Sequence, residues 1–235
     1  MLTSTRDRIG AATGVAYGTA LFIGNGMATS GQSSSMHPTG QAVLRDAAHA
    51  ASSTTATIGF TLEILGFALF FPFLGYLADL LRRRTADGRV GTAGATAIVA
   101  GITMVAIKLG SAAPIVALSM DRKQLDPQLA RVLNDINGAA FLVSWLPFAL
   151  FVGALALALR EVGLVGRPTA WIGIAFGVVG VVLSVHGLSD PLDAVPLAFM
   201  AGMLWLQVVA IRLMVKTEPD PAAVPSRPEL AVTGA

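Results

Sequence analysis

Six long apolar stretches dominate the sequence and restrict how the chain can fold more than any other feature. They lie near residues 9–28, 55–78, 93–118, 137–159, 169–188 and 194–214. Each has about the 20 residues that a helix needs to cross the ~30 Å hydrocarbon core of a bilayer. The bilayer core contains no water, so the backbone of each span must satisfy its own hydrogen bonds, which favours helices. The sequence therefore predicts an all-α transmembrane bundle of six spans.

The composition of the chain agrees with this prediction. Of its 235 residues, 54% are hydrophobic and only 13% are charged, whereas a soluble domain has about 25% charged residues. This balance excludes a disordered chain, a fibrous protein and an ordinary soluble enzyme. The absence of cysteine excludes a disulfide or a thiolate ligand. The basic residues are spread between the apolar stretches, so we expect no nucleic-acid partner.

Lysine and arginine are distributed unequally between the two sets of connections. One set contains eleven of them: Arg6, Arg8, Arg82, Arg83, Arg84, Arg89, Arg160, Arg167, Arg212, Lys216 and Arg227. The opposite set contains only Arg45, Arg122, Lys123 and Arg131. Because connections rich in Lys and Arg stay in the cytoplasm, we expect both termini there, in a multi-pass protein of the plasma membrane.

Two boundaries follow from these patterns. Residues 1–216 are predicted to form one transmembrane domain, and residues 217–235, which contain four prolines, a disordered cytoplasmic tail. An alternative for the first stretch is a signal peptide, because Gly26-Met27-Ala28 has the small-x-small form of a cleavage site. Cleavage there would leave five spans and place the new N-terminus outside.

The two long exterior connections contain signals for further helices. Residues 29–54 form the longer connection, and residues 41–50 within it can form a short surface helix. In the second connection, residues 120–136, Asp126 is a predicted N-cap and Pro127 the first helical residue.

Glycines recur at four-residue spacing on two of the predicted spans. Gly10, Gly14 and Gly18 share one face of the first span, and Gly173 and Gly177 share one face of the fifth. In lipid, such faces let helix backbones approach closely, because van der Waals contact replaces the hydrophobic drive for association. We expect them to pack within the chain. The alternative is that they bind a second copy or another membrane protein.

Two ionisable residues lie inside predicted spans, where a charge costs about 2.5–3.5 kcal/mol. Glu63 is eight residues past Thr55, and Lys108 is ten residues before Leu118. At ~1.5 Å per residue both lie roughly 12–15 Å from the same outer face. An ion pair between them is one expectation, and it predicts that removing one partner destabilises more than removing both. The pair either fixes helix register or forms the polar wall of an outward-facing pocket.

Histidines and aspartates gather near the predicted outer face. His186 is near the end of the fifth span, Asp190 and Asp193 follow it, and His37 and His49 belong to the first exterior connection. Such groups can bind a metal, but no spacing matches a ligand motif. We therefore interpret His186 as a polar residue at the membrane boundary and predict neither a metal nor a cofactor.

The order of several short motifs is familiar. A glycine-rich first span is followed later by Leu125-Asp126, Leu133-Asn134-Asp135, Leu159-Arg160 and Arg167-Pro168-x-x-Trp171-x-Gly173. In this order the chain resembles a large group of small six-span integral membrane proteins, common in actinobacteria, whose function is uncharacterised. The resemblance implies the six-span topology and transfers no active residues. Thr169 and Ala170 depart from the aromatic or second basic residue expected there.

Catalytic signals such as a nucleophile elbow, a phosphate-binding loop or an intramembrane aspartate pair are absent from the sequence. The sequence therefore supports no particular enzyme activity, and an intramembrane enzyme stays a third alternative with no catalytic group of residues behind it. Its leading interpretation is the binding or translocation of a small solute, with Glu63 and Lys108 in the wall of the pocket. The alternative is a structural or assembly subunit that packs against another membrane protein through its glycine faces.

Overall fold

The computed structural model describes residues 5–32, 38–85, 87–187 and 194–215, and all regular structure within them is helical. Seven helices occur in this part of the chain: α1 (Thr5–Ala28), α2 (Gly40–Ser52), α3 (Thr54–Arg84), α4 (Thr92–Asp121), α5 (Pro127–Glu161), α6 (Arg167–Gly187) and α7 (Ala194–Val215). The predicted tail, residues 217–235, lies outside the described residues.

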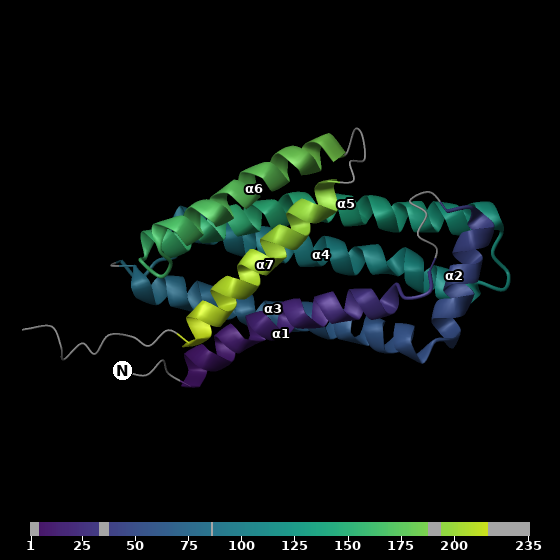
Figure 1. Ribbon diagram of the computed structural model, residues 1–235, viewed down its shortest axis with the longest axis horizontal. Helices are drawn as coiled ribbons and strands as arrows, with labels where there is room; N and C mark the ends of the chain where they lie inside the picture. The colour runs from purple at the N-terminus through teal and green to yellow at the C-terminus, as the bar shows by residue number, and fades with distance from the viewer. Residues whose placement is uncertain (1–4, 33–37, 86, 188–193, 216–235) are drawn as a thin grey trace, which may run out of the picture.

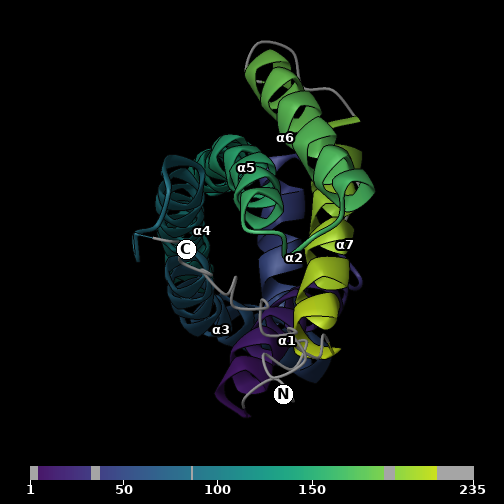
Figure 2. The same ribbon diagram turned by 90° about the vertical axis from the view of Figure 1, so that its left-hand side faces the viewer.

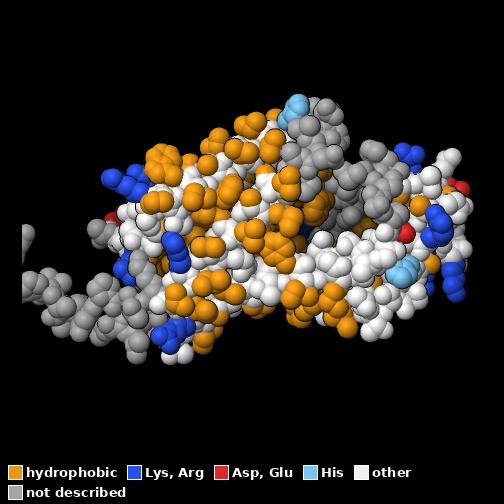
Figure 3. Space-filling model, viewed as in Figure 1, with side chains coloured by type: hydrophobic (Ala, Val, Ile, Leu, Met, Phe, Trp, Pro, Cys, Tyr) orange, Lys and Arg blue, Asp and Glu red, His pale blue; other side chains and the backbone are white. Residues whose placement is uncertain are grey.

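Five of these helices, α3 to α7, are long and apolar enough to cross a membrane. Figure 3 shows hydrophobic side chains over the middle of the molecule, with Lys and Arg gathered toward its two ends. The prediction of an all-α bundle with several spans is confirmed at this level. α1 is not among these five helices, because glycine, threonine, tyrosine and asparagine make up much of the helix after Arg8 and lower its mean hydropathy.

Two local predictions are confirmed at the end of the molecule where α2 lies. The Asp126 side chain accepts a hydrogen bond from the Gln128 backbone N–H at 2.7 Å, and Pro127 opens α5. The short surface helix is α2, which Thr39 caps through the backbone N–H of Ala42. The apolar side of α2 packs on the ends of α4 and α5 through Val43, Leu118 and Ala130.

The helices are arranged around the middle of the bundle. α1 packs mainly along α3, α4 along α5, and α6 along the outer side of α5. α7 crosses obliquely and contacts both α1 and α6. Figure 2 shows α1, α3, α4, α5 and α7 surrounding the centre, with α2 across the far end. We call that end the α2 end. The opposite end, called the arginine end, has Arg6, Arg82, Arg83, Arg84, Arg160 and Arg212.

The core of the bundle is aromatic and lies where α1, α3, α4 and α5 meet. Tyr17 and Phe70 are fully buried with ring centroids 4.4 Å apart, and the rings of Phe70 and Phe151 are T-shaped with centroids 5.3 Å apart. Gly101 of α4 gives Leu74 of α3 room to approach, since an added Cβ would lie 2.9 Å from that side chain. These contacts hold α3 against α4 and α5.

The predicted glycine faces pack inside the chain. An added Cβ at Gly10 would lie 2.5 Å from the Tyr76 ring of α3, and one at Gly177 would lie 2.6 Å from the Gly153 backbone of α5. The remaining contacts follow the same pattern: Gly14 meets Phe73, Gly18 meets Gln207, and Gly173 meets Trp205 and Ala156. Neighbouring helices of the same chain therefore fill both faces.

Charged side chains join α1 to α3 at the arginine end. Arg83 contacts Asp7 at 2.5 Å and Asp79 at 3.1 Å. Asp79 also contacts Arg82 at 3.1 Å and Arg6 at 3.8 Å. Asp7 is buried, so its contact with Arg83 is better shielded from solvent than an ordinary surface pair.

This shielding predicts that Asp7→Asn lowers stability by about 1–2 kcal/mol, more than a surface pair usually contributes. The matched control is Asp135→Asn, because Asp135 pairs with Arg131 at 3.6 Å with both side chains more than half exposed, and we expect a loss below about 0.5 kcal/mol there. Thermal unfolding of the purified variants in detergent measures both. Equal losses at Asp7 and Asp135 would contradict the prediction.

Candidate functional site

Lys108 is the most unusual side chain of the bundle. It lies on α4 and is only 8% exposed. Its Nζ atom lies 2.9 Å from the centroid of the Phe141 ring on α5 and 5.9 Å from that of Phe199 on α7, positions in which an aromatic face attracts a cation. Within the described part of the chain, Nζ makes neither a hydrogen bond nor a direct salt bridge. The ammonium thus has three donors that lack a hydrogen-bond acceptor among the described residues.

Glu63 lies on α3 and is half-buried. Its carboxylate accepts a hydrogen bond from Asn25 Nδ2 of α1 at 3.1 Å. The charges of Glu63 and Lys108 attract each other through space, but they form no direct salt bridge. The predicted direct ion pair is therefore not present. The reason is that α3 has its main contacts with α1 and α4 with α5, so each charge has a nearer partner on another helix.

Five helices thus contribute one side chain each to this region: α1 gives Asn25, α3 Glu63, α4 Lys108, α5 Phe141 and α7 Phe199. These are the five helices that surround the centre of the bundle in Figure 2. We call these five side chains the central site. It lies in the half of the bundle nearer the α2 end.

Aromatic rings continue from the central site toward α6. The Phe141 ring meets Trp145 edge-on at 5.1 Å, and Trp145 stacks on Phe199 with centroids 5.8 Å apart. Phe148 also packs against Phe199, with ring centroids 4.6 Å apart. Trp145 is 4% exposed, and its buried Nε1 has no hydrogen-bond partner. A buried indole N–H usually has a hydrogen-bond acceptor, so the unpaired Nε1 of Trp145 is an exception to this rule.

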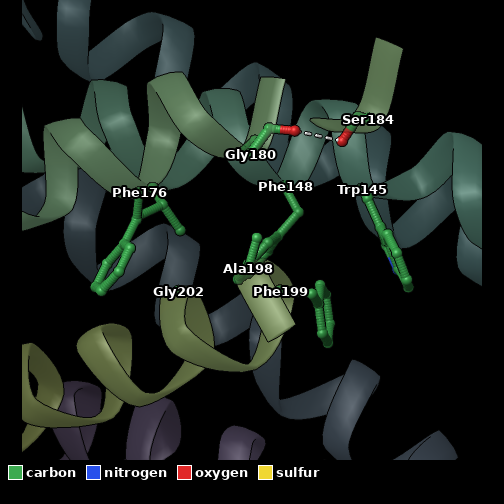
Figure 4. Close-up of a pocket in the computed structure, with 10 residues that line it drawn as sticks. Trp145, Phe148, Phe176, Gly180, Ser184, Ala198, Phe199 and Gly202 are labelled. Atoms are coloured by element: carbon green, nitrogen blue, oxygen red, sulfur yellow. Dashed lines mark hydrogen bonds between the residues drawn. The ribbon is translucent and has the colours of Figure 1, made fainter. Parts of the chain in front are cut away.

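Trp145 also lines a narrow cavity between α5, α6 and α7 (Figure 4). The cavity holds about 10 Å³, which is close to the room that one water molecule needs. Phe148, Phe176 and Phe199 are the other aromatic residues of its wall, and Ser184 is its one hydroxyl. The Ser184 hydroxyl donates to the Gly180 carbonyl at 2.6 Å. The cavity is therefore almost wholly apolar.

The structure describes two of the histidines that the sequence places near the outer face. His186 is exposed near the end of α6, and His49 lies on the exposed side of α2. In the described part of the chain, no three His, Asp or Glu side chains are grouped so that they could hold a metal. His37, Asp190 and Asp193 lie outside the described residues. The interpretation of His186 as a boundary residue stays a prediction.

Sequence reasoning identified Glu63 and Lys108 but not their partners. Asn25 was detectable in principle, since it is a polar side chain within an apolar stretch and such residues are often functional. Phe141 and Phe199 carried no such signal, because phenylalanine is ordinary in a membrane helix. The free N–H of Trp145 could not be read from sequence, since it depends on what surrounds the ring.

Comparisons with protein-family models, with curated proteins and with solved structures find no match to this chain. The function proposed below therefore depends on the geometry of the central site.

Proposed function

We propose that this protein is a six-span protein of the plasma membrane, with both termini in the cytoplasm, that binds and translocates a small solute at the central site. α1 serves as the sixth span, because its 24 residues extend about 36 Å and it packs along α3. The gathering of arginines at the end where α1 begins supports the orientation.

The observation that carries this proposal is that Lys108 is buried against aromatic rings and has no hydrogen-bond acceptor among the described residues. A purely structural lysine at this depth would be expected to have a carboxylate or a carbonyl as its direct partner, because an unpaired charge is costly in a membrane. Lys108 instead faces aromatic rings, while Glu63 bonds to Asn25. Unfilled donors at a junction of five helices are typical of a binding site whose ligand supplies the missing acceptor. The glycine faces supply no comparable argument for an assembly subunit, because they are filled within the chain.

The proposal predicts that water reaches Glu63 and Lys108 from the α2 end. The chain has no cysteine, so Glu63→Cys and Lys108→Cys each introduce a single thiol. A membrane-impermeant thiosulfonate added to intact cells should modify both at least ~10-fold faster than Ile64→Cys, because thiolate forms only where water is present. Ile64 neighbours Glu63 on α3 and is 62% exposed to the surroundings of the bundle, so it is the matched lipid-facing control.

Two further thiols test the orientation in the same experiment. Ser52→Cys, exposed at the α2 end, should react in intact cells, and Asp87→Cys, exposed at the arginine end, only after permeabilisation. If Glu63→Cys and Lys108→Cys react no faster than Ile64→Cys while Ser52→Cys reacts readily, the solute-binding proposal is wrong. If Asp87→Cys is the one modified in intact cells, the orientation is wrong.

A further inference from the structure

The arginines of the arginine end fall into two groups that differ in their partners. Where α1 meets α3, Arg6, Arg82 and Arg83 share the carboxylates of Asp7 and Asp79. The second group lies on α5, α6 and α7 and consists of Arg160, Arg167 and Arg212. Among the described residues, no carboxylate lies within salt-bridge distance of this second group. Its positive charge is therefore not neutralised by the described part of the chain.

The first turn of α6 brings the second group together. α6 begins at Arg167, at the arginine end (Figure 1). Arg212 of α7 donates to the Thr169 hydroxyl at 2.7 Å, and the guanidinium carbon of Arg160 on α5 lies 5.1 Å from the centroid of the Trp171 ring. Residues 167, 169 and 171 extend over only about 6 Å of the helix, so the three arginines belong to one small part of the surface. We call these five residues the α6 basic surface.

The acidic residue nearest in sequence, Glu161, borders a different part of the molecule. Glu161 lines a cavity of about 260 Å³ together with Leu81 and Arg84 of α3 and Gly94 of α4. No residue of α6 lines that cavity, and α6 packs along the outer side of α5. Glu161 therefore lies toward α3 and α4, and the α6 basic surface keeps its positive charge.

An exposed apolar strip continues along α6 from the α6 basic surface. Trp171 is 57% exposed, and Ile172, Val178 and Val182 are each at least half exposed. Their spacing places them along one side of a helix that is long and apolar enough to cross a membrane. Tryptophan is typical of the level of the lipid headgroups, and aliphatic residues of the hydrocarbon. The surface thus combines cations at headgroup level with an apolar strip beside them.

We propose that the α6 basic surface binds an anionic phospholipid. Guanidinium groups form paired hydrogen bonds with phosphate oxygens, and arginines at the membrane boundary attract anionic lipids. The phosphate accepts hydrogen bonds from the arginines, and an acyl chain lies along the exposed strip of α6. None of the five side chains of the central site belongs to this surface, so the inference is independent of solute binding there.

Trp171 supplies a local test, because the other two tryptophans, Trp145 and Trp205, are only 4% and 5% exposed. Brominated acyl chains quench tryptophan fluorescence on contact. Brominated phosphatidylglycerol and brominated phosphatidylcholine are titrated separately into the purified full-length protein in detergent. We expect half-maximal quenching at a mole fraction at least about tenfold lower for phosphatidylglycerol, since each arginine near an anionic surface changes binding about fivefold. Trp171→Phe should lose most of the quenching.

Matched variants assign the lipid preference to these arginines. Arg212→Gln removes the charge but preserves a hydrogen-bonding side chain, and we expect the preference for phosphatidylglycerol to fall about fivefold. Arg160→Gln combined with Arg212→Gln should abolish it. Arg82→Gln makes the same change at the same end, where Asp79 already neutralises the charge at 3.1 Å, and we expect the preference to be unchanged. Circular dichroism of each variant confirms that it is folded.

Four results would overturn the inference. The first is equal quenching by the two lipids. The second is a loss of preference in Arg82→Gln as large as in Arg212→Gln, because charge anywhere at the arginine end would then suffice. The third is displacement of phosphatidylglycerol by soluble glycerol phosphate at the same concentration, because the surface would then bind phosphate without the lipid. The fourth is a preference that appears only when Glu218→Gln and Asp220→Asn are introduced together, because the chain's own carboxylates would then occupy the surface.

Discussion

Replacing Gly59 with leucine is expected to separate α1 from α3 and to lower the stability of the protein more than any other single change considered. A Cβ at Gly59 would meet the backbone nitrogen of Ala28 and lie 2.7 Å from the carbonyl oxygen of Gly24. These are backbone atoms of α1, so no side-chain rotation can make room. Overpacking of a tight contact costs about 1–3 kcal/mol and occasionally more, and we expect at least the upper end here.

Gly75→Leu is the control for this substitution, because it makes the same change on the same helix. Gly75 has no atom within 4 Å of an added Cβ, and leucine is the better helix former by roughly 0.8 kcal/mol. We expect Gly75→Leu to unfold at the same temperature or slightly higher, and Gly59→Leu about 6–12 °C lower. The milder Gly59→Ala should fall between them. Coincident unfolding of Gly59→Leu and Gly75→Leu would show that α1 and α3 do not pack at this contact.

Replacing Lys108 with methionine is expected to stabilise the fold while it removes a group that the site needs. Methionine has nearly the length of lysine and makes favourable contacts with aromatic rings such as Phe141. The substitution removes the desolvation cost of the ammonium, about 2.5–3.5 kcal/mol, and loses a cation–π contact of about 1–2 kcal/mol. We expect a net gain of about 1–2 kcal/mol, or a melting temperature about 3–6 °C higher.

Lys123→Met is the matched control, because Lys123 is exposed near the α2 end and we expect a change within about 0.5 kcal/mol there. The measurement is thermal unfolding in the absence of added ligand. A strong loss of stability in Lys108→Met would mean that Lys108 is a structural cation, as in the ion pair with Glu63 that the sequence suggested. A gain in stability is the result expected of a residue that is retained for its ligand.

For Glu63 and Lys108, the sequence predicted the depth of the two side chains but not their nearest partners. Hydropathy and the rise per residue placed both charges at similar depth, and both do lie in the half of the bundle nearer the α2 end. The inference of a direct pair assumed that consecutive spans are closest neighbours. In the structure α3 packs mainly with α1 and α4 with α5, so Asn25 and Phe141 are nearer to these charges than they are to each other.

For the glycine faces, too, the sequence predicted the position of the surfaces but not the partners that fill them. Their four-residue spacing identified helix surfaces suited to close approach, because spacing along one helix is a local property. The spacing did not say what would fill them. Gly14 meets an aromatic ring of α3 and Gly18 an amide side chain of α7, two helices that are far apart in the sequence.

The approximate positions of the helices and the start of α5 at Asp126 and Pro127 could be derived from this sequence alone, because they depend on local hydropathy and on neighbouring residues. Their lengths could not, since α5 is one continuous helix over Pro127–Glu161, although its apolar stretch covers only residues 137–159. The low content of charge likewise determined the class of protein, because so few charges cannot cover a surface in water. The acceptorless donors of Lys108 and Trp145 were decided by the tertiary structure. Whether a buried donor has a partner depends on which helices surround it, and lateral packing between helices in lipid follows van der Waals contact rather than order along the chain.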